Sequence, residues 1–173
     1  MQNLWNTLIY GPAGAFVWSE NISRVVITAL LSMVPTFEGR YALAVAQAMG
    51  MPAIPAFIIA LVCSTIPMLV LLPLLRPVLD LMYKLPSGFV RKIAAWVDAR
   101  AQRKVGSMDK KGLLGLYIFV ALPLPGTGVW TGSLIATFLK MNKKHAAATI
   151  FLGNLTACLI MTVLTYLGVS IFS

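Results

Sequence analysis

The sequence predicts an all-α integral membrane protein, built as an inverted repeat of a re-entrant helical hairpin plus a transmembrane helix, with an amphipathic interfacial helix between the halves. Of the 173 residues, 59% are hydrophobic and 11% are charged, whereas a soluble domain carries about 25% charged residues. Most of the 14 basic residues gather in short stretches between long apolar segments, a pattern typical of membrane-protein loops. The length fits one membrane domain, residues 1–173.

The basic balance of the chain excludes some classes of function. A net charge of +9 could indicate nucleic-acid binding. The basic residues are concentrated in loops between apolar segments, however, which favours a membrane protein. We therefore expect no nucleic-acid partner. Cys63 and Cys158 lie in apolar stretches without metal-site spacing, and His145 is a lone histidine. The sequence therefore predicts no metal and no cofactor. Because it contains neither a hydrolase triad nor a nucleotide-binding loop, it also predicts no enzyme.

The N-terminal segment, residues 1–20, is apolar over residues 4–18 but is interrupted by Gly11 and Pro12. The apolar part is shorter than the roughly 20 residues that a spanning helix needs. An interfacial helix and a spanning helix therefore remain equally good predictions.

The first repeat covers residues 24–75. Its first part, residues 24–50, is an apolar run interrupted by Pro35 and then by Glu38-Gly39-Arg40. Its second part, residues 52–75, carries no charge and is long enough to span a membrane. Pro67 can kink this span without ending it.

Residues 76–111 form a basic loop. Within it Ser87 can cap a helix, and apolar residues recur at helical spacing over residues 87–104, with charged residues mostly on the other side. This pattern predicts an amphipathic helix lying on an anionic membrane surface. A solvated connector helix packed on the protein itself is the alternative.

The second repeat covers residues 112–172. Its first part, residues 112–139, contains the string ALPLPGTGVWTG, and its last part, residues 146–172, is an uncharged span. The flanking basic loops, 76–111 and 140–144, should both face the cytoplasm. A single crossing by residues 112–139 would place the two loops on opposite sides.

The conflict disappears if this segment enters from the cytoplasm, breaks, and returns to the same side. Pro123 and Pro125 remove amide donors at the break, and non-helical backbone at depth is tolerated where protein buries it or where it lines a wet cavity. Pro35 and Gly39 are the corresponding predicted breaks in the first half. We therefore expect a multi-pass membrane protein with both basic loops in the cytoplasm.

The two halves can be aligned with a shift of 88, which lays Pro35 on Pro123 and Ala42 on Trp130. The first hairpin would then enter from the outside and the second from the inside. Such an inverted-topology repeat is common in transporters, which place their site where the broken helices meet.

Glu38 and Arg40 are the ionisable residues of the first apolar core, and an intramembrane ionisable residue indicates function by default. Positions two apart do not face each other on a helix, so the two side chains either share an extended turn or have different partners. Arg40 offers a planar fork of donors for phosphate or carboxylate. Glu38 suits proton coupling, since a low dielectric favours the neutral carboxyl. A mutual ion pair that holds the hairpin in shape is the alternative.

Gly126, Thr127 and Gly128 precede a predicted half-helix that begins near Val129. Free amides and the helix dipole at such a start favour an anion. Further substrate contacts are predicted for Trp130, by stacking, and for Thr131, by its hydroxyl. A turn without a ligand, and a Trp130 that only packs, remain open.

Ser64 and Asn154 follow the two hairpins at similar distances. Both could hydrogen-bond the unsatisfied backbone of a hairpin. We expect a structural role for them.

At Pro35-Thr-Phe-Glu-Gly-Arg40 and at Leu122-Pro-Leu-Pro-Gly-Thr-Gly-Val-Trp-Thr-Gly132 the chain resembles the small multi-drug export family, which is similar to the DedA-type membrane proteins. The resemblance covers residues 24–172. It implies two facing re-entrant hairpins and a bacterial or archaeal cytoplasmic membrane. For the DedA relatives it implies proton-linked translocation of phosphate-bearing lipids, chiefly undecaprenyl phosphate. DedA proteins place arginines after their second hairpin motif, whereas residues 112–139 here contain none.

Three functions follow as expectations. The first is a flippase for a phosphate-bearing lipid, in which Arg40 and the Gly126–Gly128 amides hold the phosphate and Glu38 exchanges protons. The second is a proton-coupled small multidrug exporter, and the third is a membrane scaffold without transport. Expected partners are membrane lipids, the lipid or small-molecule substrate, protons, and further copies of the chain in a homo-oligomer.

Overall fold

A computed structural model describes residues 21–35, 37–84, 109–124 and 126–172. The predicted N-terminal helix, the predicted amphipathic helix over residues 87–104 and the predicted break at Pro125 lie outside these ranges. Within the described ranges the chain is entirely helical. The six helices are α2 Ile22–Met33, α3 Glu38–Ala48, α4 Ala53–Lys84, α6 Asp109–Ala121, α7 Val129–Phe138 and α8 Lys143–Phe172.

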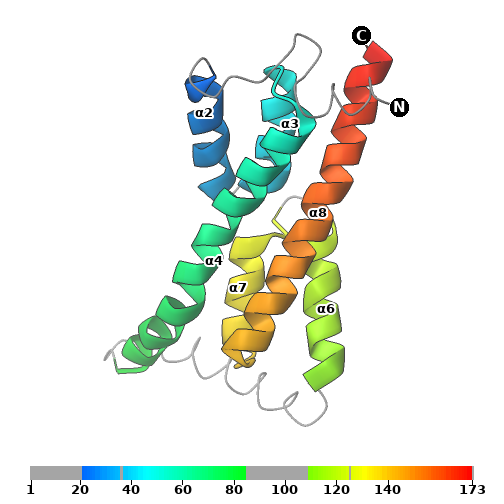
Figure 1. The fold of residues 1–173 in the computed structure, drawn as a ribbon. Coiled ribbons are helices and arrows are strands. Elements are labelled where there is room, and N and C mark those ends of the chain that lie inside the picture. Colours follow the sequence, from blue (N-terminus) through cyan, green and yellow to red (C-terminus); the bar gives the residue numbers. More distant parts are fainter. Residues whose placement is uncertain (1–20, 36, 85–108, 125, 173) are drawn as a thin grey trace.

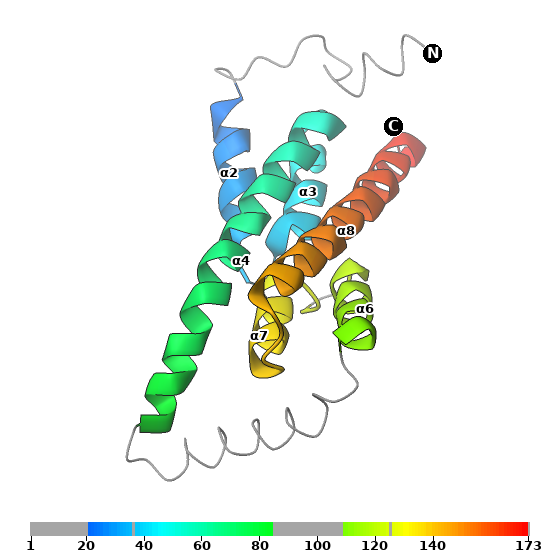
Figure 2. The same cartoon turned by 60° about the horizontal axis from the view of Figure 1, so that its bottom comes forward.

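Two short antiparallel hairpins occupy opposite ends of the molecule, and two long helices run past both of them (Figure 1). Helices α2 and α3 form the upper hairpin, and helices α6 and α7 form the lower one. Their tips meet near the middle, and the view after a 60° rotation shows the same relation (Figure 2). Helix α4 runs downward from the upper hairpin, and helix α8 runs upward from the lower one. Helices α6, α7 and α8 therefore repeat the order of α2, α3 and α4 with the chain direction reversed.

The two long helices are the candidate membrane spans. Ala53–Leu75 in α4 and Lys143–Gly168 in α8 are long and apolar enough to cross a membrane, which agrees with the predicted spans. Helix α4 continues through Pro67, Pro73 and Pro77, so the prediction that Pro67 does not end the helix is confirmed. Many large apolar side chains of α2, α4 and α8 are exposed, as is expected of surfaces that face lipid rather than water.

Short breaks separate the helices of each hairpin. In the first break α2 ends at Met33, ahead of Pro35, because proline disfavours helical geometry in the residue before it. Gly39, which we predicted as part of this break, lies in the first turn of α3 instead. In the second break Pro123 follows the end of α6.

The ends of the two hairpins repeat one another in detail. The amides of Met49, Gly50 and Met51 at the end of α3 donate to Val45, Gln47 and Ala46, and the amides of Leu139, Lys140 and Met141 at the end of α7 donate to Ile135, Thr137 and Ala136. Gly50 has φ 79° and Lys140 has φ 52°, so both positions are left-handed.

The matching hydrogen bonds at the ends of α3 and α7 are 90 residues apart, as are Ser64 and Asn154. The shift of 88 still fits the helix ends before the breaks, Met33 and Ala121. The second break, residues 122–128, is also longer than the first, residues 34–37.

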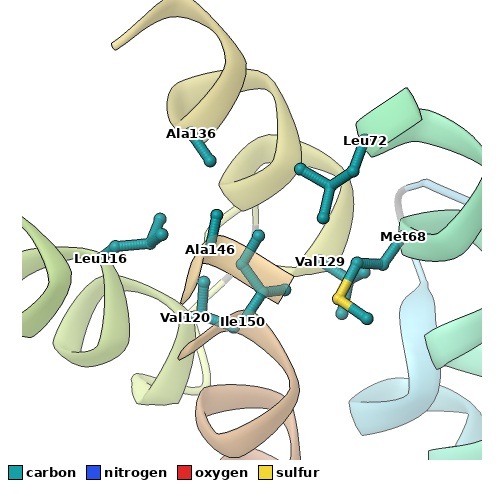
Figure 3. Packing of buried hydrophobic residues seen from close by; sticks show 8 residues of the cluster. All are labelled: Met68, Leu72, Leu116, Val120, Val129, Ala136, Ala146 and Ile150. Atoms are coloured by element: carbon teal, nitrogen blue, oxygen red, sulfur yellow. The ribbon is translucent and has the colours of Figure 1, made fainter. Parts of the chain in front are cut away.

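The largest buried cluster binds the lower hairpin to both long helices (Figure 3). Val120 of α6, Val129 of α7 and Ile150 of α8 are at most 1% exposed. The cluster consists of Met68, Leu72, Leu116, Val120, Val129, Ala136, Ala146 and Ile150. Its packing fixes the position of α7, whose first turn forms one side of the candidate site.

Candidate functional site

The carboxylate of Glu38 lies on the start of helix α7. Its Oε2 accepts a hydrogen bond from the amide of Val129 at 3.2 Å, and its Oε1 accepts one from the amide of Trp130 at 3.3 Å. Glu38 begins α3 in a left-handed conformation, with φ 51°, and is 5% exposed. The first hairpin therefore supplies the acceptor for free amides at the start of the second half-helix, where the helix dipole also favours a negative charge.

Gly128 leaves the space that this carboxylate occupies. A Cβ atom added at Gly128 would lie 1.3 Å from Oε2 of Glu38, so any other residue there would exclude the carboxylate from its present position. Gly128 is the N-cap residue of α7 and has no side chain to cap the helix. Glu38 replaces that missing cap from across the molecule.

The guanidinium of Arg40 lies at the other side of the same break, where α6 ends. Its Nη2 donates to the carbonyl of Val120 at 2.7 Å, and its Nη1 donates to the carbonyl of Leu122 at 2.6 Å and to Oγ1 of Thr127 at 3.0 Å. A longer contact of 3.2 Å joins Nη2 to the Thr127 carbonyl. The last carbonyls of a helix have no partner within the helix, so Arg40 neutralises the negative end of α6.

Glu38 and Arg40 thus divide the second break between them. The anion binds the start of α7 and the cation binds the end of α6, each with the polarity that the helix dipoles favour. Of the two arrangements that the sequence left open, a shared extended turn or different partners, the structure has different partners. We name the two residues and their contacts with the second break the inter-hairpin clasp.

One donor of the clasp has no partner. The Nε of Arg40 is buried and makes no hydrogen bond. Among the described residues, the Nε2 of Gln47 is likewise buried and makes no hydrogen bond. Arg40 is only 1% exposed. A buried donor without an acceptor is costly, and Nε of Arg40 retains the capacity to donate one hydrogen bond.

Thr127 and Gly126 shape the second break. Besides accepting from Arg40, the hydroxyl of Thr127 lies 2.8 Å from the Leu122 carbonyl and 2.9 Å from the Leu124 carbonyl, so it can donate to either. Gly126 has φ 79°, a left-handed conformation that glycine adopts without strain.

The remaining predicted contacts lie in the first turn of α7. The indole Nε1 of Trp130 donates to the carbonyl of Met33 at 3.2 Å, so Trp130 joins the two hairpin tips. The sequence did not predict this bond, because every residue has a backbone carbonyl and the identity of Met33 does not mark it as an acceptor. Thr131 is half-buried in the same turn.

Ser64 and Asn154 make a contact other than the predicted one. The amide Nδ2 of Asn154 donates to Oγ of Ser64 at 2.8 Å, and Ser64 bonds the Leu61 carbonyl of its own helix at 3.2 Å. The predicted bonds to hairpin backbone are therefore replaced by a bond between the long helices. The sequence did contain one indication of this contact, because Ser64 and Asn154 follow their hairpins at similar distances.

Comparison with known proteins gives a family. A family model described as "Putative small multi-drug export protein" matches residues 38–160, well over half of the chain. No curated protein and no solved structure matches the chain. The match begins at Glu38 and includes both halves of the clasp. Together with the two apolar helices, it indicates a membrane protein that acts as a transporter rather than an enzyme.

Proposed function

Because the chain belongs to the small multi-drug export family, we propose that it is a proton-coupled membrane transporter that moves a phosphate-bearing lipid through the inter-hairpin clasp. The observation that carries this proposal is the carboxylate of Glu38 on the amides of Val129 and Trp130. In this proposal that carboxylate stands where the phosphate of the substrate binds.

The proposed topology places the clasp near the middle of the membrane. The α2–α3 and α6–α7 hairpins are re-entrant, and they enter from opposite faces as halves of an inverted repeat. The meeting of the hairpin tips between two long apolar helices supports this placement (Figure 1). Transporters with broken helices bind anionic groups at the starts of half-helices in the same way.

Charge balance favours an anionic substrate. With Glu38 ionised, the clasp holds one negative and one positive charge and is neutral. When Glu38 takes up a proton, its hydrogen bonds with the α7 amides weaken because the carboxyl is no longer charged. The positive charge of Arg40 is then uncompensated in a low-dielectric site. An anion that binds the vacated amides restores neutrality, and its entry is therefore linked to proton uptake.

Arg40, a residue of α3, would hold the phosphate beside the end of α6, which its guanidinium contacts. Its two terminal nitrogens are engaged by the carbonyls of Val120 and Leu122, whereas its buried Nε is a free donor. The predicted contacts from Gly126–Gly128, Trp130 and Thr131 complete the proposed site. The single arginine substitutes for the arginines that DedA proteins carry after their second motif.

The apolar tail of the substrate would remain in the bilayer. Val34 and Phe37, at the tip of the first hairpin, are 40% and 45% exposed, so apolar surface lies close to Glu38 in sequence and in space. A carrier of this kind needs no aqueous cavity that would enclose the whole substrate. It therefore suits a short chain.

The carbonyl oxygens around Arg40 support a second candidate, export of an organic cation. The oxygens of Val120, Leu122 and Thr127 converge on one guanidinium, and another cation could replace it if Arg40 withdrew. Glu38 would then be the counter-ion. This candidate requires Arg40 to leave its buried position, which the phosphate proposal does not.

Reconstituted vesicles test the proposal. We would follow labelled undecaprenyl phosphate between leaflets, with and without a proton gradient, in the parent protein, in Glu38→Gln and in Arg40→Ala. We expect movement that responds to the gradient in the parent and is lost in both variants. Arg24→Ala is the matched control, since Arg24 is exposed and bonds Asn21 on the surface.

Absence of lipid movement by a folded, inserted parent would reject the lipid substrate. A drug-resistance phenotype that is lost in Glu38→Gln and kept in Arg40→Ala would instead support the cation candidate.

A further inference from the structure

Ser64 and Asn154 form a buried polar contact between the two long helices. Ser64 is 1% exposed and Asn154 is 0% exposed, and the hydrogen bond between them is 2.8 Å long. The thiol of Cys158 lies 3.8 Å from Oδ1 of Asn154. Polar side chains are rare in apolar interiors unless they are paired, so this contact is a specific feature of the crossing of α4 and α8.

The pair also has a special place in the repeat. Its members are 90 residues apart, the same shift that superposes the hydrogen bonds at the ends of α3 and α7, Gly50 on Lys140. Ser64 and Asn154 are thus equivalent positions of the two halves that touch each other. Equivalent residues can touch only where the pseudo-twofold axis that relates the halves passes between them.

The first hairpin packs closely on the same point. A Cβ atom added at Gly39 would lie 2.8 Å from Oγ of Ser64 and 2.8 Å from the carbonyl of Ala60. The start of α3, one residue after Glu38, therefore rests directly on α4 beside the Ser64–Asn154 bond. A rotation of the hairpin about this point would move Glu38 away from α7 without opening the crossing of the long helices.

We infer that the Ser64–Asn154 pair is the fixed pivot about which the two halves exchange conformations during transport. When pseudo-symmetric halves exchange conformations, contacts far from their common axis change, and a contact on that axis is retained. Separating the pair would also leave two buried polar groups without partners. Ser64 and Asn154 are positioning residues, and the inference rests on the proposed transport function.

Cross-linking of two cysteine pairs tests the pivot. Both pairs are made in a background with Cys63→Ala and Cys158→Ala, and the thiols are bridged by oxidation or by mercuric ion. The pivot pair is Ser64→Cys with Asn154→Cys. The comparison pair is Met33→Cys with Leu124→Cys, at exposed positions of the two hairpin tips outside the proposed substrate contacts. Lipid movement in vesicles is measured before and after bridging.

We expect the bridged pivot pair to keep the transport rate of its reduced form, and the bridged tip pair to lose transport. Loss of transport on bridging the pivot pair would overturn the inference. If the parent moves no lipid, the proposed function fails, and the pivot is judged by cross-linking yields across pH. A constant yield at the pivot with a varying yield at the tips supports it, and any other result contradicts it.

Spin labels at exposed residues give a second readout that does not disturb the buried pair. Val62 and Leu152 are equivalent exposed positions beside the pivot, and Phe37 and Leu124 are exposed at the tips. Pulsed electron resonance should give a pH-independent distance for the first pair and a pH-dependent distance for the second. A distance change at the first pair that matches the change at the tips would overturn the inference.

Discussion

The guanidinium of Arg40 is held as a bound ion would be, by backbone oxygens of a different hairpin. Its hydrogen bonds to the Val120 and Leu122 carbonyls are the shortest of its set, at 2.7 Å and 2.6 Å. Removing one partner from a buried, charged contact typically costs about 3–5 kcal/mol. We therefore predict that Arg40→Ala lowers the free energy of unfolding in detergent by about that amount.

Chemical rescue separates a lost charge from a lost side-chain shape. Added guanidinium at millimolar concentration should raise the unfolding temperature of Arg40→Ala, because it can refill the carbonyl cradle. Tetramethylammonium, which has the same charge and no N–H donor, should not. Equal effects of the two ions, or none, would show that the cradle does not depend on a hydrogen-bonding cation.

Gly128 gives a second prediction at the scale of single residues. A methyl group there would occupy the position of the Glu38 carboxylate. We predict that Gly128→Ala displaces Glu38 and lowers the free energy of unfolding by about 0.5–2 kcal/mol, the usual value of a lost helix cap. It should also lower transport, since the proton-binding group loses its position.

Gly115→Ala is the matched control for this change. Gly115 lies in α6 with open space around its Cβ position, so alanine should stabilise the helix by about 0.5–1 kcal/mol. Thermal unfolding in detergent measures both variants. A Gly128→Ala protein as stable as the control would show that the close approach of Glu38 and Gly128 has no energetic role.

At the scale of helices, the sequence predicts where helices begin and end, but it does not predict which residues of the two hairpins contact each other. Apolar length and proline position predicted the two candidate spans and the start of α7 at Val129. They could not predict that Glu38 caps α7 or that Trp130 bonds Met33. Both contacts join residues more than ninety positions apart, and local patterns carry no information on such pairing.

The left-handed ends of α3 and α7 allow a prediction about helix termination. Lys140 adopts φ 52° where its equivalent in the first half is Gly50, and a left-handed conformation costs a residue with a Cβ atom roughly 1–2 kcal/mol. Lys140→Gly should therefore raise the free energy of unfolding by about 1 kcal/mol. Gly50→Ala should lower it by a similar amount. Equal stability of parent and Lys140→Gly in thermal unfolding would contradict this assignment of strain.

At the scale of the whole molecule, the proposed transporter has two hairpins that open toward opposite faces of the membrane. Ala48 ends α3 and Lys143 begins α8, and both residues are exposed. The end of α3 and the start of α8 lie at opposite ends of the fold (Figure 1). With Cys63 and Cys158 replaced by alanine, we predict that Ala48→Cys reacts with an impermeant thiol reagent only from outside the cell and Lys143→Cys only from the cytoplasm. Labelling of both from one face would reject the inverted repeat.

Proton uptake during substrate binding shows whether the phosphate of the lipid replaces the carboxylate of Glu38. Phosphate lipid is added to the protein in weakly buffered nanodiscs, and the pH change is followed in the parent and in Glu38→Gln. If phosphate replaces the carboxylate on the α7 amides, the parent takes up about one proton more per bound lipid than the variant does, because only the parent has Glu38 to protonate. Binding with equal proton uptake in the two proteins would contradict the exchange of phosphate for Glu38.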